Sequence, residues 1–188
     1  MNPTIEVRMT TEAPKATFNL NMHTHKLLHK EPFFAALSRR IDKRACTSVP
    51  TAGVRVTDEG RFEMLYNPDF MLKMIEECGN TKENADNPYR WVRGILMHEF
   101  YHLIFEHVTN RKPADGLKRI DNIAMDLAIN GLPEMKGKLP CEADPGPLMP
   151  GGEPMKGCLP GEGPFAELPA GKTYEWYLEA LKDMAEEQ

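Results

Sequence analysis

The sequence predicts an α+β protein that is mainly helical and carries one small β-hairpin. Apolar residues recur at helical spacing in several separate stretches, whereas one stretch alternates apolar and polar residues on both sides of a glycine turn. With 188 residues, the chain has the length of one domain with a sizeable core. We therefore expect a single domain over residues 1–188.

The N-terminal part of the chain begins without a regular pattern and then becomes helical. We expect residues 1–20 to form a flexible arm. Residues 27–42, LLHKEPFFAALSRRID, place apolar residues at helical spacing and predict a helix with Pro32 in a first turn.

The next two elements have clear local signals. Residues 52–67, AGVRVTDEGRFEMLYN, alternate in the manner of strands around Asp58-Glu59-Gly60 and predict a β-hairpin. The following NPDFMLKMIEECG predicts a short helix that Asn67 caps and Gly79 closes.

The C-terminal half predicts three more helices and one long irregular segment. Helices are expected at 88–109 and 116–130, and a last one begins after Thr173 as its N-cap. Residues 133–170 are rich in proline and glycine, so we expect them to be more mobile than the helices, either covering a cleft or forming an ordinary surface loop. The last helix directs four apolar side chains towards the core: Trp176, Leu178, Leu181 and Met184.

Charge and composition exclude several classes of function. A net charge of −5 without a basic stripe argues against a nucleic-acid partner. No stretch is apolar and long enough to span a membrane, and the N-terminus lacks the apolar run of a signal peptide. The four cysteines show no CxxC spacing. We expect a cytoplasmic protein with reduced cysteines.

The stretch GILMHEFYHLIFEH, residues 94–107, carries the strongest functional signal. His98 and His102 are four residues apart, which on a helix is about 400° of rotation, so they share one face one turn apart. Two imidazoles in this arrangement can bind one tetrahedral metal ion, and Glu99 beside them can act as a general base. Because burying these residues unpartnered in an apolar segment would be costly, we predict a zinc site.

A third protein ligand has to come from elsewhere in the chain. Asn122, Asp126 and Asn130 form a stripe along one edge of the following helix, and a short loop would bring that helix back against the first. We favour Asp126 as the third ligand, with the two asparagines hydrogen-bonded to the ligands. His107 is the alternative, although it points elsewhere if the helix is continuous; Glu106 lies too far along the axis.

The combined motifs resemble a known family. HEFYHLIFEH followed by Arg111, then NIAMDLAIN, then a proline-rich segment and LPAGKTYEWYLEAL, resemble the bacterial and phage metallopeptidase domain that usually precedes a von Willebrand A-like domain. The resemblance covers about residues 30–182. It implies a zincin-like fold, with the HExxH histidines and a downstream acid as zinc ligands, Glu99 as base, and a small sheet over the HExxH helix.

Three functions are compatible with these residues. The first is a zinc metallopeptidase acting on a protein or peptide substrate, which would add to RFEMLYN as an edge strand. The second is a zinc-stabilised protein that binds a host or partner protein without cleaving it. The third, an amidase of the peptide deformylase type, is disfavoured because Cys158 follows the HExxH motif instead of preceding it. Tyr174 and Tyr177 could assist as electrophiles, but we expect both to pack in the core.

Overall fold

The computed structural model describes residues 18–149 and 151–186, and these contain six α-helices and one three-stranded sheet. The prediction of a flexible arm over residues 1–20 lies outside the described residues as far as residue 17; of the remainder, Phe18 is buried and Leu20 begins the first helix, so the prediction was wrong there. The helices are α1 (Leu20–Lys30), α2 (Pro32–Ser38), α3 (Pro68–Asn80), α4 (Arg90–Ile104), α5 (Arg119–Asn130) and α6 (Tyr174–Glu186). The strands are β1 (Ile41–Ala45), β2 (Ala52–Val56) and β3 (Phe62–Tyr66). The predicted mixed, mainly helical class is therefore confirmed.

The sheet contains the predicted hairpin and one further strand. β2 and β3 pair antiparallel, with Val54 opposite Met64, and Gly60 takes the positive φ of 75° that the turn requires. β1 pairs parallel with β3, which gives the strand order β1-β3-β2. The prediction that RFEMLYN forms an edge was therefore wrong: β3 is the central strand, and β1 and β2 are the two edge strands.

The first predicted helix is in fact divided between two helices. Pro32 opens α2 at its first position, as expected, but Glu31 before it has a non-helical backbone, with φ −137° and ψ 75°, and α1 ends there. Proline excludes the helical conformation from the residue that precedes it, so one helix cannot run through this point. At the other end, Ile41 belongs to β1 instead of the helix.

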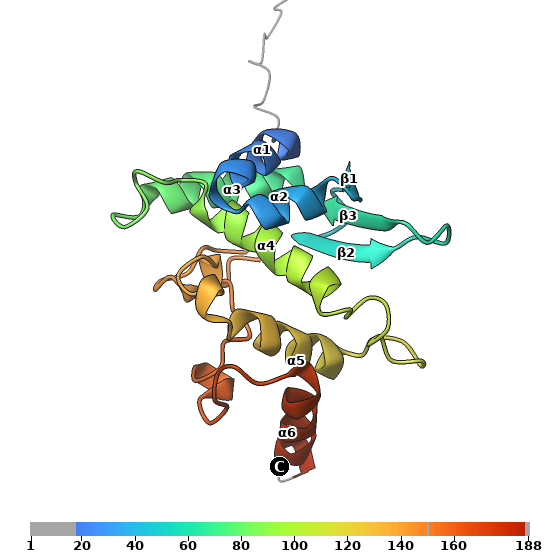
Figure 1. The fold of residues 1–188 in the computed structure, drawn as a ribbon. Coiled ribbons are helices and arrows are strands. Elements are labelled where there is room, and N and C mark those ends of the chain that lie inside the picture. The colour runs from blue at the N-terminus through green and yellow to red at the C-terminus, as the bar shows by residue number, and fades with distance from the viewer. Residues whose placement is uncertain (1–17, 150, 187–188) are drawn as a thin grey trace, which may run out of the picture.

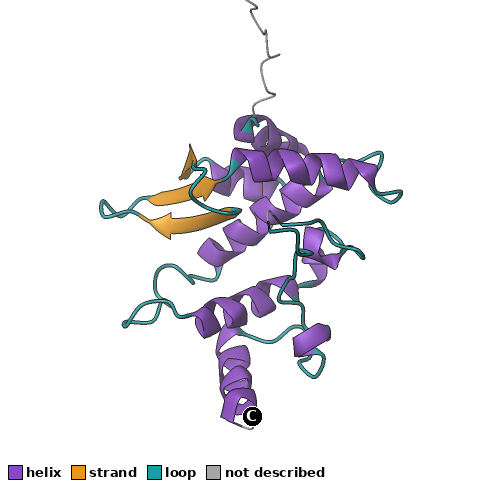
Figure 2. Ribbon diagram, turned by 180° about the vertical axis from the view of Figure 1, so that it is seen from behind, coloured by secondary structure: helices purple, strands orange, loops and turns teal. Residues whose placement is uncertain are grey.

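The buried apolar side chains form two hydrophobic clusters. The larger group contains side chains of helices α1, α2, α3 and α4 and of the sheet. The smaller group lies between α5 and α6. α5 contributes to both, since Ile129 packs in the first group and Leu127 in the second. Figure 1 shows α4 between α1–α3 on one side and α5 on the other, with α5 returning in the opposite direction; Figure 2 shows the same arrangement from behind.

The C-terminal helix follows its prediction except at one residue. The Trp176 backbone N–H donates to Thr173 Oγ1 at 3.4 Å, in agreement with Thr173 as the N-cap. Tyr174 and Tyr177 are buried, as expected, and their hydroxyls donate to Asp121 and to the Pro169 carbonyl. Trp176 is 38% exposed, so its assignment to the core was wrong. Among the described residues, no helix has the length and apolar character of a membrane span.

Candidate metal centre

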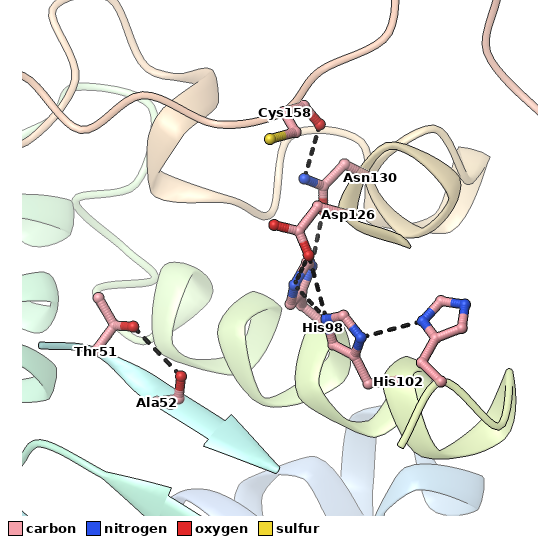
Figure 3. A network of polar contacts seen from close by, with 8 residues as sticks. Thr51, Ala52, His98, His102, Asp126, Asn130 and Cys158 are labelled. Atoms are coloured by element: carbon pink, nitrogen blue, oxygen red, sulfur yellow. Dashed lines mark hydrogen bonds and ion pairs between the residues drawn. The ribbon is translucent and has the colours of Figure 1, made fainter. Parts of the chain in front are cut away.

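α4 and α5 bring the predicted ligand residues together at one point. The Nε2 atoms of His98 and His102 lie 3.1 Å apart, and Asp126 Oδ1 lies 3.4 Å from the first and 3.3 Å from the second. The three side chains form a group whose ligand atoms could hold a metal ion. Figure 3 shows Asp126 on α5 pointing towards the two histidines on α4.

The spacing of the three ligand atoms matches tetrahedral coordination. Four ligands at about 2.0–2.1 Å from a zinc ion lie about 3.3–3.4 Å from one another. The observed distances of 3.1, 3.3 and 3.4 Å are close to these values. The three atoms thus have the spacing of one face of a tetrahedron, and among the described residues no fourth His, Cys, Asp or Glu joins the group.

The ligand group lies in the wall of a cavity of about 560 Å³. Glu99 lines this cavity together with His98, His102 and Asp126, and it is only 9% exposed. The edge strand β2 and the residue before it, Thr51, form part of the wall (Figure 3). The segment after α5 forms much of the remainder, so part of the proline-rich segment covers the cavity instead of lying apart on the surface.

Asn130 holds His98 in a defined orientation. Its Nδ2 donates to the Cys158 carbonyl at 2.9 Å, which directs Oδ1 at His98 Nδ1, 2.8 Å away. A carbonyl oxygen only accepts, so His98 Nδ1 carries a hydrogen, and Nε2 presents a lone pair to the ligand group once the ring has lost its second proton. The predicted contact of Asn130 with a candidate ligand is therefore present. Asn122 is exposed and lines the cavity, but within the described ranges it makes no hydrogen bond to the ligand group.

The chain ends α4 earlier than predicted and folds back. Glu106 has φ 59°, a left-handed conformation that side chains other than glycine seldom adopt. His107 consequently returns to α4, and its Nδ1 lies 3.1 Å from Nδ1 of His102. His107 is therefore near the site, but on the opposite ring edge of His102 from Asp126. The geometry favours Asp126 over His107 as the third ligand.

Burial and the neighbouring charges determine the protonation of these groups. Burial lowers the pKa of His98, but the hydrogen bond and charge of Asp126 outweigh it, with smaller help from Glu99, and raise the pKa to about 9. Burial raises the pKa of Asp126, yet His102 and His98 bring it well below its usual range. Burial, followed by the charges of His102 and Arg111, lowers the pKa of His107 to about 3, so His107 is neutral.

The two cysteines at the cavity are unsuited to catalysis. Burial raises the pKa of both Cys141 and Cys158 to about 12, so they stay thiols at neutral pH. All four cysteines are free, in agreement with the prediction of reduced thiols. What Cys158 contributes is its backbone carbonyl, which the sequence did not indicate.

Comparison with known proteins adds no relative. No family model matches the chain, and neither the curated proteins nor the solved structures contain a match. The resemblance to metallopeptidase domains stays a prediction from the motifs.

Proposed function

We propose that the protein is a zinc-dependent metallopeptidase, with Glu99 as the general base. The observation that supports this most is the open tetrahedral face formed by His98, His102 and Asp126 beside a glutamate in the same cavity. A purely structural zinc site closes all four positions with protein ligands. A donor set of two imidazoles and one carboxylate suits zinc.

Each residue has a defined task in this proposal. His98 Nε2, His102 Nε2 and Asp126 Oδ1 would hold the ion. Bound zinc would supply Lewis acidity, which polarises the substrate carbonyl and acidifies water at the free position. The Glu99 carboxylate accepts a proton from the attacking water and passes it to the leaving amine nitrogen. Asn130 keeps the hydrogen of His98 on Nδ1, so that Nε2 stays available.

The substrate strand would lie along β2. One side of β2 pairs with β3, and its other side has no strand partner in the part of the chain that the structure describes. Residues of β2 also line the cavity. An extended peptide can add to such an edge through its backbone hydrogen bonds. Gly53 leaves room for it, because a Cβ built there meets no atom within 4 Å. The apolar lining, which includes Phe70, Ile95 and Met125, suits an apolar substrate side chain.

The test is the substitution Glu99→Gln in zinc-loaded protein. Glutamine keeps the size and polarity of the side chain but cannot take the proton, so cleavage of a broad peptide library should fall by about 10²–10⁴-fold. Zinc content by elemental analysis should stay near one ion per chain, whereas His98→Ala and His102→Ala should lose it. Glu76→Gln, an exposed position on α3, is the matched control and should cleave like the wild type.

Two results would contradict the proposal, the first for the role of Glu99 and the second for the peptidase itself. One is a Glu99→Gln protein that cleaves as fast as the wild type. The other is a Glu99→Gln protein that keeps the full biological phenotype while the histidine variants lose it. The second result would favour the non-catalytic protein that binds a partner, because binding does not need a proton acceptor at Glu99.

A further inference from the structure

The turn that ends α4 brings His107 against a candidate ligand. The His107 N–H donates to the His102 carbonyl at 2.9 Å, and the Glu106 N–H donates to the Leu103 carbonyl at 3.1 Å. These two bonds, with Glu106 left-handed between them, define a Schellman motif, in which the residue after the left-handed one packs on the last full turn of the helix. Glycine usually takes the left-handed position, so a glutamate there carries a cost of about 1–2 kcal/mol.

The contact that results brings the Nδ1 atoms of two imidazole rings to hydrogen-bond distance, with the ring planes inclined at 67° to each other. When His98, His102 and Asp126 hold an ion, His102 Nε2 would give its lone pair to that ion, so Nδ1 must carry the hydrogen of the neutral ring. The group 3.1 Å from that hydrogen-bearing atom is His107 Nδ1. It has to be the acceptor, and the hydrogen of His107 is then on Nε2.

Packing of the fold alone does not explain why residue 107 is a histidine. His107 is fully buried, and its Nε2 has no hydrogen-bond partner among the described residues. A buried N–H without a partner costs about 1–3 kcal/mol, which an apolar side chain would avoid. The arrangement is useful if Nδ1 is what the site requires.

The surroundings hold the His107 ring in place. It packs against the rings of Phe105 and Tyr174, at centroid distances of 5.7 Å each. Arg111 fastens the same turn, because it donates to the Phe105 carbonyl at 3.3 Å and pairs with Glu175 on α6. The first turn of α6 thus supports the segment that carries His107.

We propose that His107 is a positioning residue that accepts the Nδ1 hydrogen of His102 and thereby fixes the tautomer and ring orientation of that ligand. It serves His102 as Asn130 serves His98. Groups that orient a metal ligand in this way typically change metal affinity 10–100-fold when removed. The inference depends on the metal site of the proposed function, but not on peptide cleavage.

A matched pair of variants separates this role from packing. In His107→Asn, Oδ1 is bonded to Cγ as Nδ1 is in histidine, so an acceptor stays near its present position. In His107→Leu, the side chain branches at the same atom but offers no acceptor. Zinc affinity is measured by chelator competition, and Co²⁺ absorption reports the ligand geometry. We expect leucine to weaken zinc binding about 10–100-fold, and asparagine to restore most of it.

The thermal stability of the metal-free protein gives a second test, in which His107→Leu should not be weaker than the wild type. Metal-free His107→Leu should melt at or above the wild-type temperature, because it removes the unpartnered Nε2–H. In zinc-loaded wild type, ¹⁵N shifts of the histidine rings should show His107 Nδ1 without hydrogen and Nε2 with it. If leucine binds zinc like the wild type, or if His107 Nδ1 carries the hydrogen, the inference is wrong. If both variants lose zinc as completely as His102→Ala, His107 is a ligand, which also overturns it.

The outcome for His107 can be distinguished from the outcome for the peptidase. A wild type that binds zinc but cleaves nothing removes the peptidase and leaves the affinity and tautomer tests intact. A wild type that cleaves while His107→Leu keeps full zinc affinity removes only the role of His107.

Discussion

Gly94 offers a sharp test of how the HExxH helix is packed. It lies in α4 one turn before His98, and a Cβ built on it would be 2.0 Å from the Lys138 carbonyl oxygen and 2.7 Å from the carbonyl carbon. The obstructing atoms belong to the backbone, so no side-chain rotation relieves the contact. The chain after α5 therefore passes directly over this glycine.

The magnitude for Gly94→Ala follows from two opposing effects. Alanine gains about 1 kcal/mol over glycine inside a helix. Against this, the Lys138 carbonyl must move by roughly 1 Å before the contact becomes tolerable, and overpacking of this kind costs about 1–3 kcal/mol or more. Because backbone is displaced, we take the upper end and expect a net loss of about 2 kcal/mol. For a chain of this length that lowers the melting temperature by about 4–8 °C.

The assay is thermal unfolding beside a second helical glycine as control. Gly79 lies in α3, and its Cβ would meet Pro88 Cβ at 3.1 Å, a contact that a small shift relieves. Gly79→Ala should therefore keep the wild-type melting temperature within a few degrees or raise it, since helix propensity gains about 1 kcal/mol. The reasoning is refuted if both variants are equally stable. Gly94→Ala should also disturb the cavity, because Leu139 and Cys141 beside Lys138 line it.

Elements with a local signal were predicted well, and those that depend on distant contacts were not. The hairpin follows from alternation around Gly60, and α3 follows from the Asn67-Pro68 start, where the Asn67 side chain accepts from two backbone N–H groups. β1 was missed because IDKRA is largely polar, and only its parallel pairing with β3 makes it a strand. That pairing also turned the expected edge strand into the central one.

The candidate site shows the same division. Helical periodicity predicted that His98 and His102 share a face and that Asp126 and Asn130 lie on one stripe of the next helix, and the structure brings these residues together. The fold-back of His107 could not be predicted, since the usual glycine signal is absent and Glu106 takes its place. Local periodicity thus places the candidate ligands and Asn130, whereas a chain reversal places His107.

Two further predictions concern the ligand group itself. Asp126→Ala should weaken zinc binding by more than the roughly 100-fold that is typical for removing an outer hydrogen-bond partner. Asn122→Ala, one turn earlier on the same stripe, is the control and should change zinc binding little. Equal effects of the two substitutions in chelator competition would mean that Asp126 is not a ligand. The second concerns pH in metal-free protein. The pKa of His98 is raised to about 9, so its pairing with Asp126 stabilises the fold fully below the ordinary value of about 6.5 and is lost as pH rises through 9. The Asp126 pKa is lowered, so the carboxylate contributes above about pH 3.8 and its contribution is lost at lower pH. Melting temperatures should therefore fall between pH 6.5 and 9 without metal. Zinc has to displace the His98 proton, so binding should tighten over that same range and release about one proton at pH 7.5, measured by calorimetry in buffers of different ionisation enthalpy. Zinc binding without proton release at that pH would show that His98 is already neutral in the metal-free protein.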